Sequence, residues 1–114
     1  MKAIYIILVS VLLGAVGQIA FKIGAMRIPE AGPLLDKAMA AWPIGAGLVL
    51  YGISTLLWIY ALRSVELSYA YPLISLGYVL VFMASYFLFH ESIGPLRLGG
   101  MALILSGIIL IAKS

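Results

Sequence analysis

The sequence of 114 residues contains no cysteine, one histidine and four acidic residues, and these scarcities exclude several classes of function. Without cysteine there is no disulfide framework. The chain also has no cluster of metal-ligating residues, no glycine-rich phosphate loop before a helix, and no nucleophile–histidine–acid arrangement. We therefore expect neither an enzyme nor a bound metal or cofactor. The seven basic residues are scattered, so no nucleic-acid interface is expected.

Charge is scarce as a whole, and long apolar runs take its place. Only 10% of the residues are charged and 65% are hydrophobic, with a mean hydropathy of +1.21. Because a helix needs about 20 mostly apolar residues to cross a bilayer, the runs predict an all-α membrane protein with four transmembrane helices in a single domain, residues 1–114. The predicted spans are residues 3–22, 40–62, 68–89 and 95–112. The first run is long for a cleaved signal peptide.

Short connections predict antiparallel neighbours, so both ends of the chain should lie on one side of the membrane. The positive-inside rule does not decide which side, because the basic residues are divided almost evenly. One side would hold Lys2, Arg63 and Lys113, and the other Lys22, Arg27, Lys37 and Arg97. Two interpretations stay open: insertion in both orientations, or an orientation fixed by a partner or by Lys2.

The first span carries a polar and small-residue face formed by Ser10, Gly14, Gly17, Gln18 and Lys22. Spacings of three and four place these residues on one side of a helix. One interpretation is a packing seam, where small residues admit a second helix and the lysine reaches the headgroups. The other is a binding site. A lysine near the membrane favours an anion, and phosphate is the natural one.

Aromatic and hydroxyl side chains form a stripe along the third span at Tyr71, Ser75, Tyr78, Phe82 and Ser85. Such a stripe suits ordinary helix packing, or the wall of a groove with rings for an apolar chain and hydroxyls for a polar head. Pro72 should alter the local geometry beside it. The second span carries a similar face, formed by Tyr51, Thr55 and Trp58.

Two features near the fourth span also have two interpretations. Gly100 and Gly107 lie two turns apart, as in a packing face or a dimer seam. Four helices enclose a substrate poorly, so a dimer is the economical way to build a chamber. In the preceding segment "FHESIGPLR", Glu91 is either part of a solvated loop with a local ion pair or a gate carboxylate. As a gate it would pair with Lys22 or with a cationic substrate, because both residues are expected on the same membrane side.

Four segments carry a family resemblance: "GQIAFK", "AYPLISLGYVL", "HE" and "GGMALILSGIIL". Together they cover nearly the whole chain and resemble the small multidrug resistance superfamily of drug/metabolite transporters. Within it, the chain is most similar to the aminoarabinose–phosphoundecaprenol flippase subunits. Drug-exporting members carry a glutamate in the middle of the first helix. The matching position here is Gly14, and no acidic residue falls inside any predicted span.

The resemblance implies a flippase that moves a polyprenyl-phosphate-linked (amino)sugar lipid from the cytoplasmic to the periplasmic leaflet of the bacterial inner membrane. It implies a small multidrug resistance-like bundle that works as a homo- or heterodimer with a related four-helix chain. Lys22 would pair with the phosphate, and Gln18 would bind the phosphate or the sugar. Glu91 would recognise an amino group or close the gate. The route of the substrate would be lined by Tyr71, Ser75 and Tyr78. Gly14 and Gly17 would leave room for the close approach of a helix or for the isoprenoid.

Two other functions are compatible with the same residues. One is a small multidrug resistance-type exporter of cationic drugs or small metabolites, in which Glu91 would substitute for the missing glutamate. The other is a non-transporting membrane subunit that stabilises or regulates a partner.

Overall fold

The computed structural model describes residues 2–114, with the side chain of Lys2 outside the description, and this part of the chain is helical without strands. The elements in chain order are α1 (Lys2–Arg27), α2 (Leu34–Ala40), α3 (Trp42–Leu62), α4 (Leu67–Ala70), the 3₁₀-helix η1 (Tyr71–Ser75), α5 (Leu76–Phe87) and α6 (Pro95–Lys113). Across the described residues, four helices are long and apolar enough to span a membrane: Ala3–Arg27, Trp42–Leu62, Leu67–Phe87 and Pro95–Lys113. The predicted all-α, four-helix membrane fold is confirmed.

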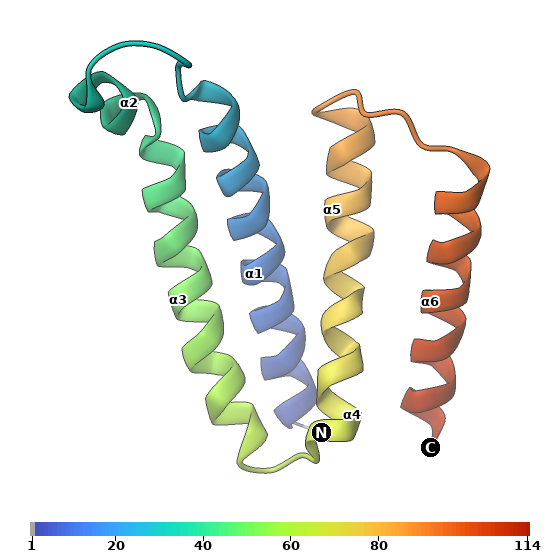
Figure 1. Cartoon of the computed structure of the whole chain (residues 1–114). Coiled ribbons are helices and arrows are strands. Elements are labelled where there is room, and N and C mark those ends of the chain that lie inside the picture. Colours follow the sequence, from blue (N-terminus) through green and yellow to red (C-terminus); the bar gives the residue numbers. More distant parts are fainter. Residues whose placement is uncertain (1) are drawn as a thin grey trace.

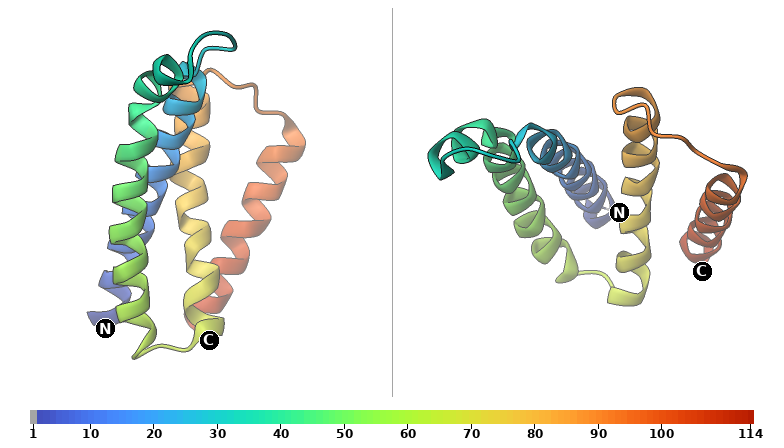
Figure 2. Two further views of the ribbon diagram at one scale, coloured as in Figure 1. Left: turned by 60° about the vertical axis from the view of Figure 1, so that its left-hand side comes forward. Right: turned by 45° about the horizontal axis from the view of Figure 1, so that its top comes forward.

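The helices alternate in direction, with α1 between α3 and α5 and with α6 on the outer side of α5 (Figure 1). The start of α1 and the end of α6 lie at the same end of the bundle (Figure 2). The boundaries differ slightly from the sequence prediction. The first helix continues beyond residue 22 to Arg27, and the second starts at Trp42, where Pro43 occupies its first turn. Proline suits that turn because the missing N–H would have no partner there.

The closest helix pair is α1 and α3, and small residues make the approach possible. A Cβ atom added to Gly17 would lie 3.1 Å from the carbonyl oxygen of Gly47. A Cβ atom added to Gly47 would lie 2.8 Å from the carbonyl oxygen of Gly17. Two backbones at this distance exchange many van der Waals contacts, which is how small residues stabilise helix pairs in membranes.

The α6 helix joins the bundle only near its carboxyl half. The buried core there consists of Ile7, Ala61, Ala70, Leu73 and Ile108, and only the last belongs to α6. Gly100 and Gly107 have nothing within 4 Å of an added Cβ atom. In the described part of the chain the glycine pair therefore has no close packing partner, and the dimer seam stays a prediction.

The third span is not one regular α-helix, and this corrects the predicted stripe. Residues Tyr71–Ser75 form the 3₁₀ turn η1, with Pro72 as its second residue. A 3₁₀ turn has about three residues per turn, so residues i and i+3 share a face. Ile74 therefore takes the place beside Tyr71 that the α-helical spacing predicted for Ser75.

Candidate functional site

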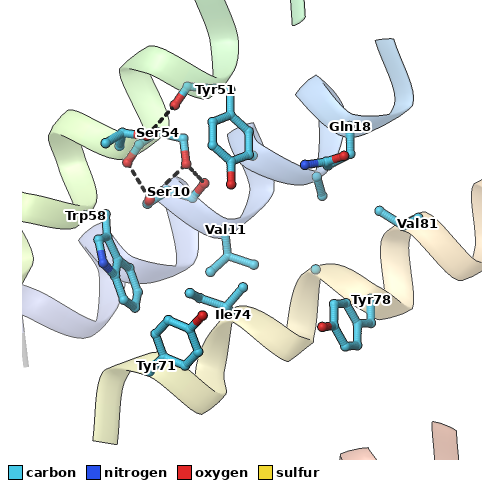
Figure 3. A pocket seen from close by; sticks show the side chains of 14 residues that line it. Ser10, Val11, Gln18, Tyr51, Ser54, Trp58, Tyr71, Ile74, Tyr78 and Val81 are labelled. Carbon is cyan, nitrogen blue, oxygen red and sulfur yellow. Dashed lines mark hydrogen bonds between the residues drawn. The ribbon is translucent and has the colours of Figure 1, made fainter. Parts of the chain in front are cut away.

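A cavity of about 530 Å³ lies between α1, α3 and the η1–α5 segment (Figure 3). Its lining combines aromatic, hydroxyl, amide and small apolar side chains. The lining residues are Ser10, Val11, Gly14, Ala15, Gln18, Tyr51, Ser54, Thr55, Trp58, Tyr71, Ile74, Gly77, Tyr78 and Val81. This set contains neither an acid nor a base. The volume falls within the range of about 300–1,000 Å³ that is typical of small-molecule sites.

Two buried serines tie α1 to α3 along one edge of the cavity. The Ser10 hydroxyl donates to the backbone oxygen of Ser54 at 2.6 Å, and the Ser54 hydroxyl donates to the backbone oxygen of Ser10 at 2.6 Å. Their two Oγ atoms lie 3.1 Å apart. Since both hydroxyls are engaged with the backbone, these residues fix the helix pair and are not the groups that remain for a ligand.

The groups available to a ligand are carried by longer side chains. In Figure 3 the hydroxyls of Tyr51, Tyr71 and Tyr78 and the amide of Gln18 are directed toward the middle of the cavity. The Tyr71 ring lies edge-on to Trp58, with ring centroids 6.4 Å apart and an angle of 72°. Edge-to-face pairs of this kind hold both rings in place. The cavity therefore offers fixed apolar faces with hydrogen-bonding groups between them.

Gly14 faces the cavity, and its position matches the one at which drug-exporting members of the resembled superfamily carry a glutamate. A Cβ atom added to Gly14 would lie 3.1 Å from the Ser54 hydroxyl oxygen, so the neighbouring serine occupies the space into which a side chain would grow. A carboxylate that exchanges a proton for a cation is absent from this wall of the cavity, and the described lining residues supply none elsewhere.

Charge is found one helical turn beyond the cavity, at the end of the bundle opposite the chain ends. Lys22 Nζ lies 3.6 Å from Glu91 Oε2, and the two side chains are 49% and 38% exposed. The same ammonium lies 6.0 Å from the centroid of the Phe89 ring. Lys22 follows Gln18 by four residues on α1, a rise of about 6 Å. The pair is thus an extension of the same helix face that lines the cavity.

The segment after α5 is bent so that Glu91 points back toward α1. His90 has a φ of 53°, in the left-handed region that few residues other than glycine occupy. The backbone N–H of Glu91 donates to the Ser85 oxygen at 2.9 Å. These two features set the direction of the chain at Glu91. The sequence left two partners open for a gate carboxylate at this position, Lys22 or a cationic substrate, and the structure contains the pair with Lys22.

The structure therefore divides the predicted site residues into groups. Gln18, Tyr71, Tyr78 and Gly14 come together at the cavity, and Lys22 and Glu91 meet beyond it. Ser75 is not among the lining residues, nor are the remaining members of the predicted stripe, Phe82 and Ser85. Gly17 lies in the seam with α3.

Ser54, Ile74 and Val81 line the cavity but were not singled out from the sequence. Ser54 had a signal, because it lies three residues after Tyr51 and four before Trp58 and so shares their helix face. Val81 had the same signal, because it lies three residues after Tyr78 in the regular helix α5. Ile74 had none, since its facing depends on the 3₁₀ turn.

Comparison with known proteins gives the family. Residues 1–113 match the EamA-like transporter family. A probable 4-amino-4-deoxy-L-arabinose-phosphoundecaprenol flippase subunit, ArnE of Pseudomonas aeruginosa, is 33% identical, with 96% of each chain covered. The probable subunit ArnF of Photorhabdus laumondii is 35% identical, with 93% of each chain covered. The uncharacterized protein y4nH of Sinorhizobium fredii is 37% identical, over 99% of this chain and 98% of that one.

No solved structure matches the chain. The resemblance to the aminoarabinose–phosphoundecaprenol flippase subunits is confirmed by relatives that extend over nearly the full length of both chains. With four helices able to span a membrane, the chain is a multi-pass membrane protein and belongs to the EamA-like transporter family.

Proposed function

We propose that this protein is a flippase subunit that moves a polyprenyl-phosphate-linked aminosugar from the cytoplasmic to the periplasmic leaflet of the bacterial inner membrane. The names of its relatives supply the substrate class. The observation that carries the proposal is the separation of roles along α1. An uncharged cavity contains Gln18, and a lysine follows one turn later at the membrane edge.

The separation suits a lipid whose parts differ in polarity. The sugar lies at the end of the cavity that is next to Lys22, where Gln18 offers hydrogen bonds, and the rings and hydroxyls of Tyr71 and Tyr78 line the cavity beyond it. The phosphate lies against Lys22, whose ammonium is the charged donor nearest to the cavity on this helix face. The isoprenoid stays outside the cavity among the lipid chains, which avoids a large protein enclosure.

The structure favours this function over export of cationic drugs. An exporter of that kind needs a carboxylate that binds a proton and the drug in turn. Glu91 is the acid that would have to serve, but a cationic drug at this carboxylate would lie beside the ammonium of Lys22 and would bring no anion to pair with it.

The open face of α6 supports a second chain in the functional unit. Gly100 and Gly107 lie on a helix that contacts the rest of the bundle only near its carboxyl half. We propose that a related four-helix chain, either a second copy or a distinct subunit, packs along these glycines. A non-transporting subunit would use the same face, so association alone does not separate the two functions, whereas substrate binding does.

Thermal unfolding of the detergent-purified protein tests the proposal. A ligand that binds only the folded state raises the apparent Tm by mass action. Undecaprenyl phosphate and its 4-amino-4-deoxy-L-arabinose derivative should both raise it. Lys22→Ala should lower the affinity for both lipids by about ten-fold or more, since hydrogen bonds to charged groups contribute about 1.5–3 kcal/mol.

Lys37→Ala is the matched control, because it removes the same charge from α2 on the same membrane side. It should bind both lipids like the wild type. Stabilisation by a quaternary ammonium drug and by neither phosphate lipid would refute the proposal and favour an exporter.

A further inference from the structure

The Lys22–Glu91 pair is weak in the geometry observed. Its N–O distance of 3.6 Å exceeds the approximately 2.7–2.9 Å of a charge-assisted hydrogen bond. Both side chains are between one third and one half exposed, and exposed pairs contribute only about 0–1 kcal/mol to stability. The contact therefore neutralises two charges in the ligand-free protein without binding them firmly to each other, and a ligand can replace it at small cost.

The two charges are also carried by separate parts of the fold. Lys22 belongs to α1, on the helix face that lines the cavity, whereas Glu91 belongs to the connection between α5 and α6. Lys22 keeps a second contact, the Phe89 ring at 6.0 Å. Glu91 keeps its backbone bond to Ser85. Each partner thus stays in position if the other turns to a ligand.

We propose that Glu91 selects substrates that carry an amino group together with the phosphate, and that the ion pair is exchanged for two new pairs when such a substrate binds. The proposal rests on the function proposed above. The phosphate takes Lys22 and the ammonium of the sugar takes Glu91, so no charge loses its counter-charge.

Selectivity follows from what happens without the amine. A phosphate lipid with a neutral sugar also takes Lys22, but it leaves the Glu91 carboxylate unpaired next to a second anion. Like charges at short range destabilise each other, most strongly where solvent is partly excluded. Glu91 therefore acts against lipids that lack an amine and in favour of those that carry one.

Removing the carboxylate should change affinity in opposite directions for different lipids. The probes are undecaprenyl phosphate, its 4-amino-4-deoxy-L-arabinose derivative, and the matched derivative with a hydroxyl in place of the amine. Wild-type protein should prefer the amine over the hydroxyl derivative by about ten-fold, the contribution of one hydrogen bond between charged groups. Glu91→Gln should abolish this preference. It should also bind plain undecaprenyl phosphate more tightly than the wild type, because Lys22 no longer has a competing anion.

Glu30→Gln is the matched control, since Glu30 is exposed in the connection between α1 and α2 and carries the same charge on the same side. It should keep the preference, as should Glu91→Asp, which retains the carboxylate. If Glu91→Gln does not fold, Glu91→Asp decides alone, because loss of the preference in that variant overturns the charge argument.

Two other results separate this inference from the proposed function. Wild-type protein that binds none of the three lipids would overturn both. Binding of the lipids with the same amine preference in Glu91→Gln, or an equal weakening for all three lipids, would overturn the role of Glu91 alone. An equal weakening would indicate that the residue supports the fold.

Discussion

Alanine at position 47 is expected to destabilise the α1–α3 pair, although glycine to alanine is usually favourable in a helix. A Cβ atom at this position would lie 2.8 Å from the Gly17 carbonyl oxygen and 2.7 Å from Cδ1 of Phe21. The Phe21 ring can turn away. The carbonyl oxygen belongs to the backbone of α1, so the two helices must separate to admit the methyl group.

The size of the effect follows from two opposing contributions. Overpacking a close contact costs typically about 1–3 kcal/mol. Alanine recovers up to about 1 kcal/mol through its higher helix propensity. We expect Gly47→Ala to lower the free energy of unfolding by about 1–2 kcal/mol. Gly45 lies two residues earlier on the same helix with nothing within 4 Å of an added Cβ atom, so Gly45→Ala should be neutral or slightly stabilising.

Reversible unfolding by sodium dodecyl sulfate in mixed micelles, followed by far-ultraviolet circular dichroism, gives the two free energies under the same conditions. The difference between the variants is the informative quantity, because helix propensity contributes equally to both. Equal stability of Gly47→Ala and Gly45→Ala would show that α1 and α3 do not approach as closely as described, and the reasoning would fail.

Two further predictions concern the helix contacts. Ser54→Ala removes one hydroxyl donor but leaves the bond from the Ser10 hydroxyl to the residue 54 carbonyl, so unfolding in the same assay should be easier by about 1 kcal/mol; no change would exclude a structural role for the bond. Gly107→Leu adds a side chain where the chain leaves open space. Monomer stability should be unchanged while association with a second chain, measured by crosslinking in membranes, is lost; unchanged association would exclude this face as the seam.

Much of the fold was predictable because each span is a long run with little or no charge. Length and apolar composition alone define such helices, and no packing information is required. The boundaries depended on local detail. The break before Trp42 reflects Pro43 in the first turn of α3. The prediction ended the first span at Lys22, whereas α1 continues past that charge through Ile23, Ala25 and Met26 to Arg27.

The site was predictable only where helical periodicity applies. Spacings of four placed Gly14, Gln18 and Lys22 on one face of α1, and the structure has them there. The same reasoning misplaced Ser75, because the 3₁₀ turn at Pro72 changes the residue period in that segment. Sequence spacing also leaves open which residues of two helices meet, so the reciprocal bonds between Ser10 and Ser54 had to come from the packed structure.

The placement of charge bears on how transport is coupled to energy. The described lining of the cavity contains no carboxylate or basic side chain. In the function proposed above, the charges of the substrate would meet the protein one turn beyond the cavity, where Lys22 and Glu91 neutralise each other in the ligand-free protein. An exchange of ion pairs in that place leaves the net charge of the protein unchanged on loading. A substrate that carries both signs would therefore cross with its charges matched, and the gradient of the lipid itself can then drive the movement.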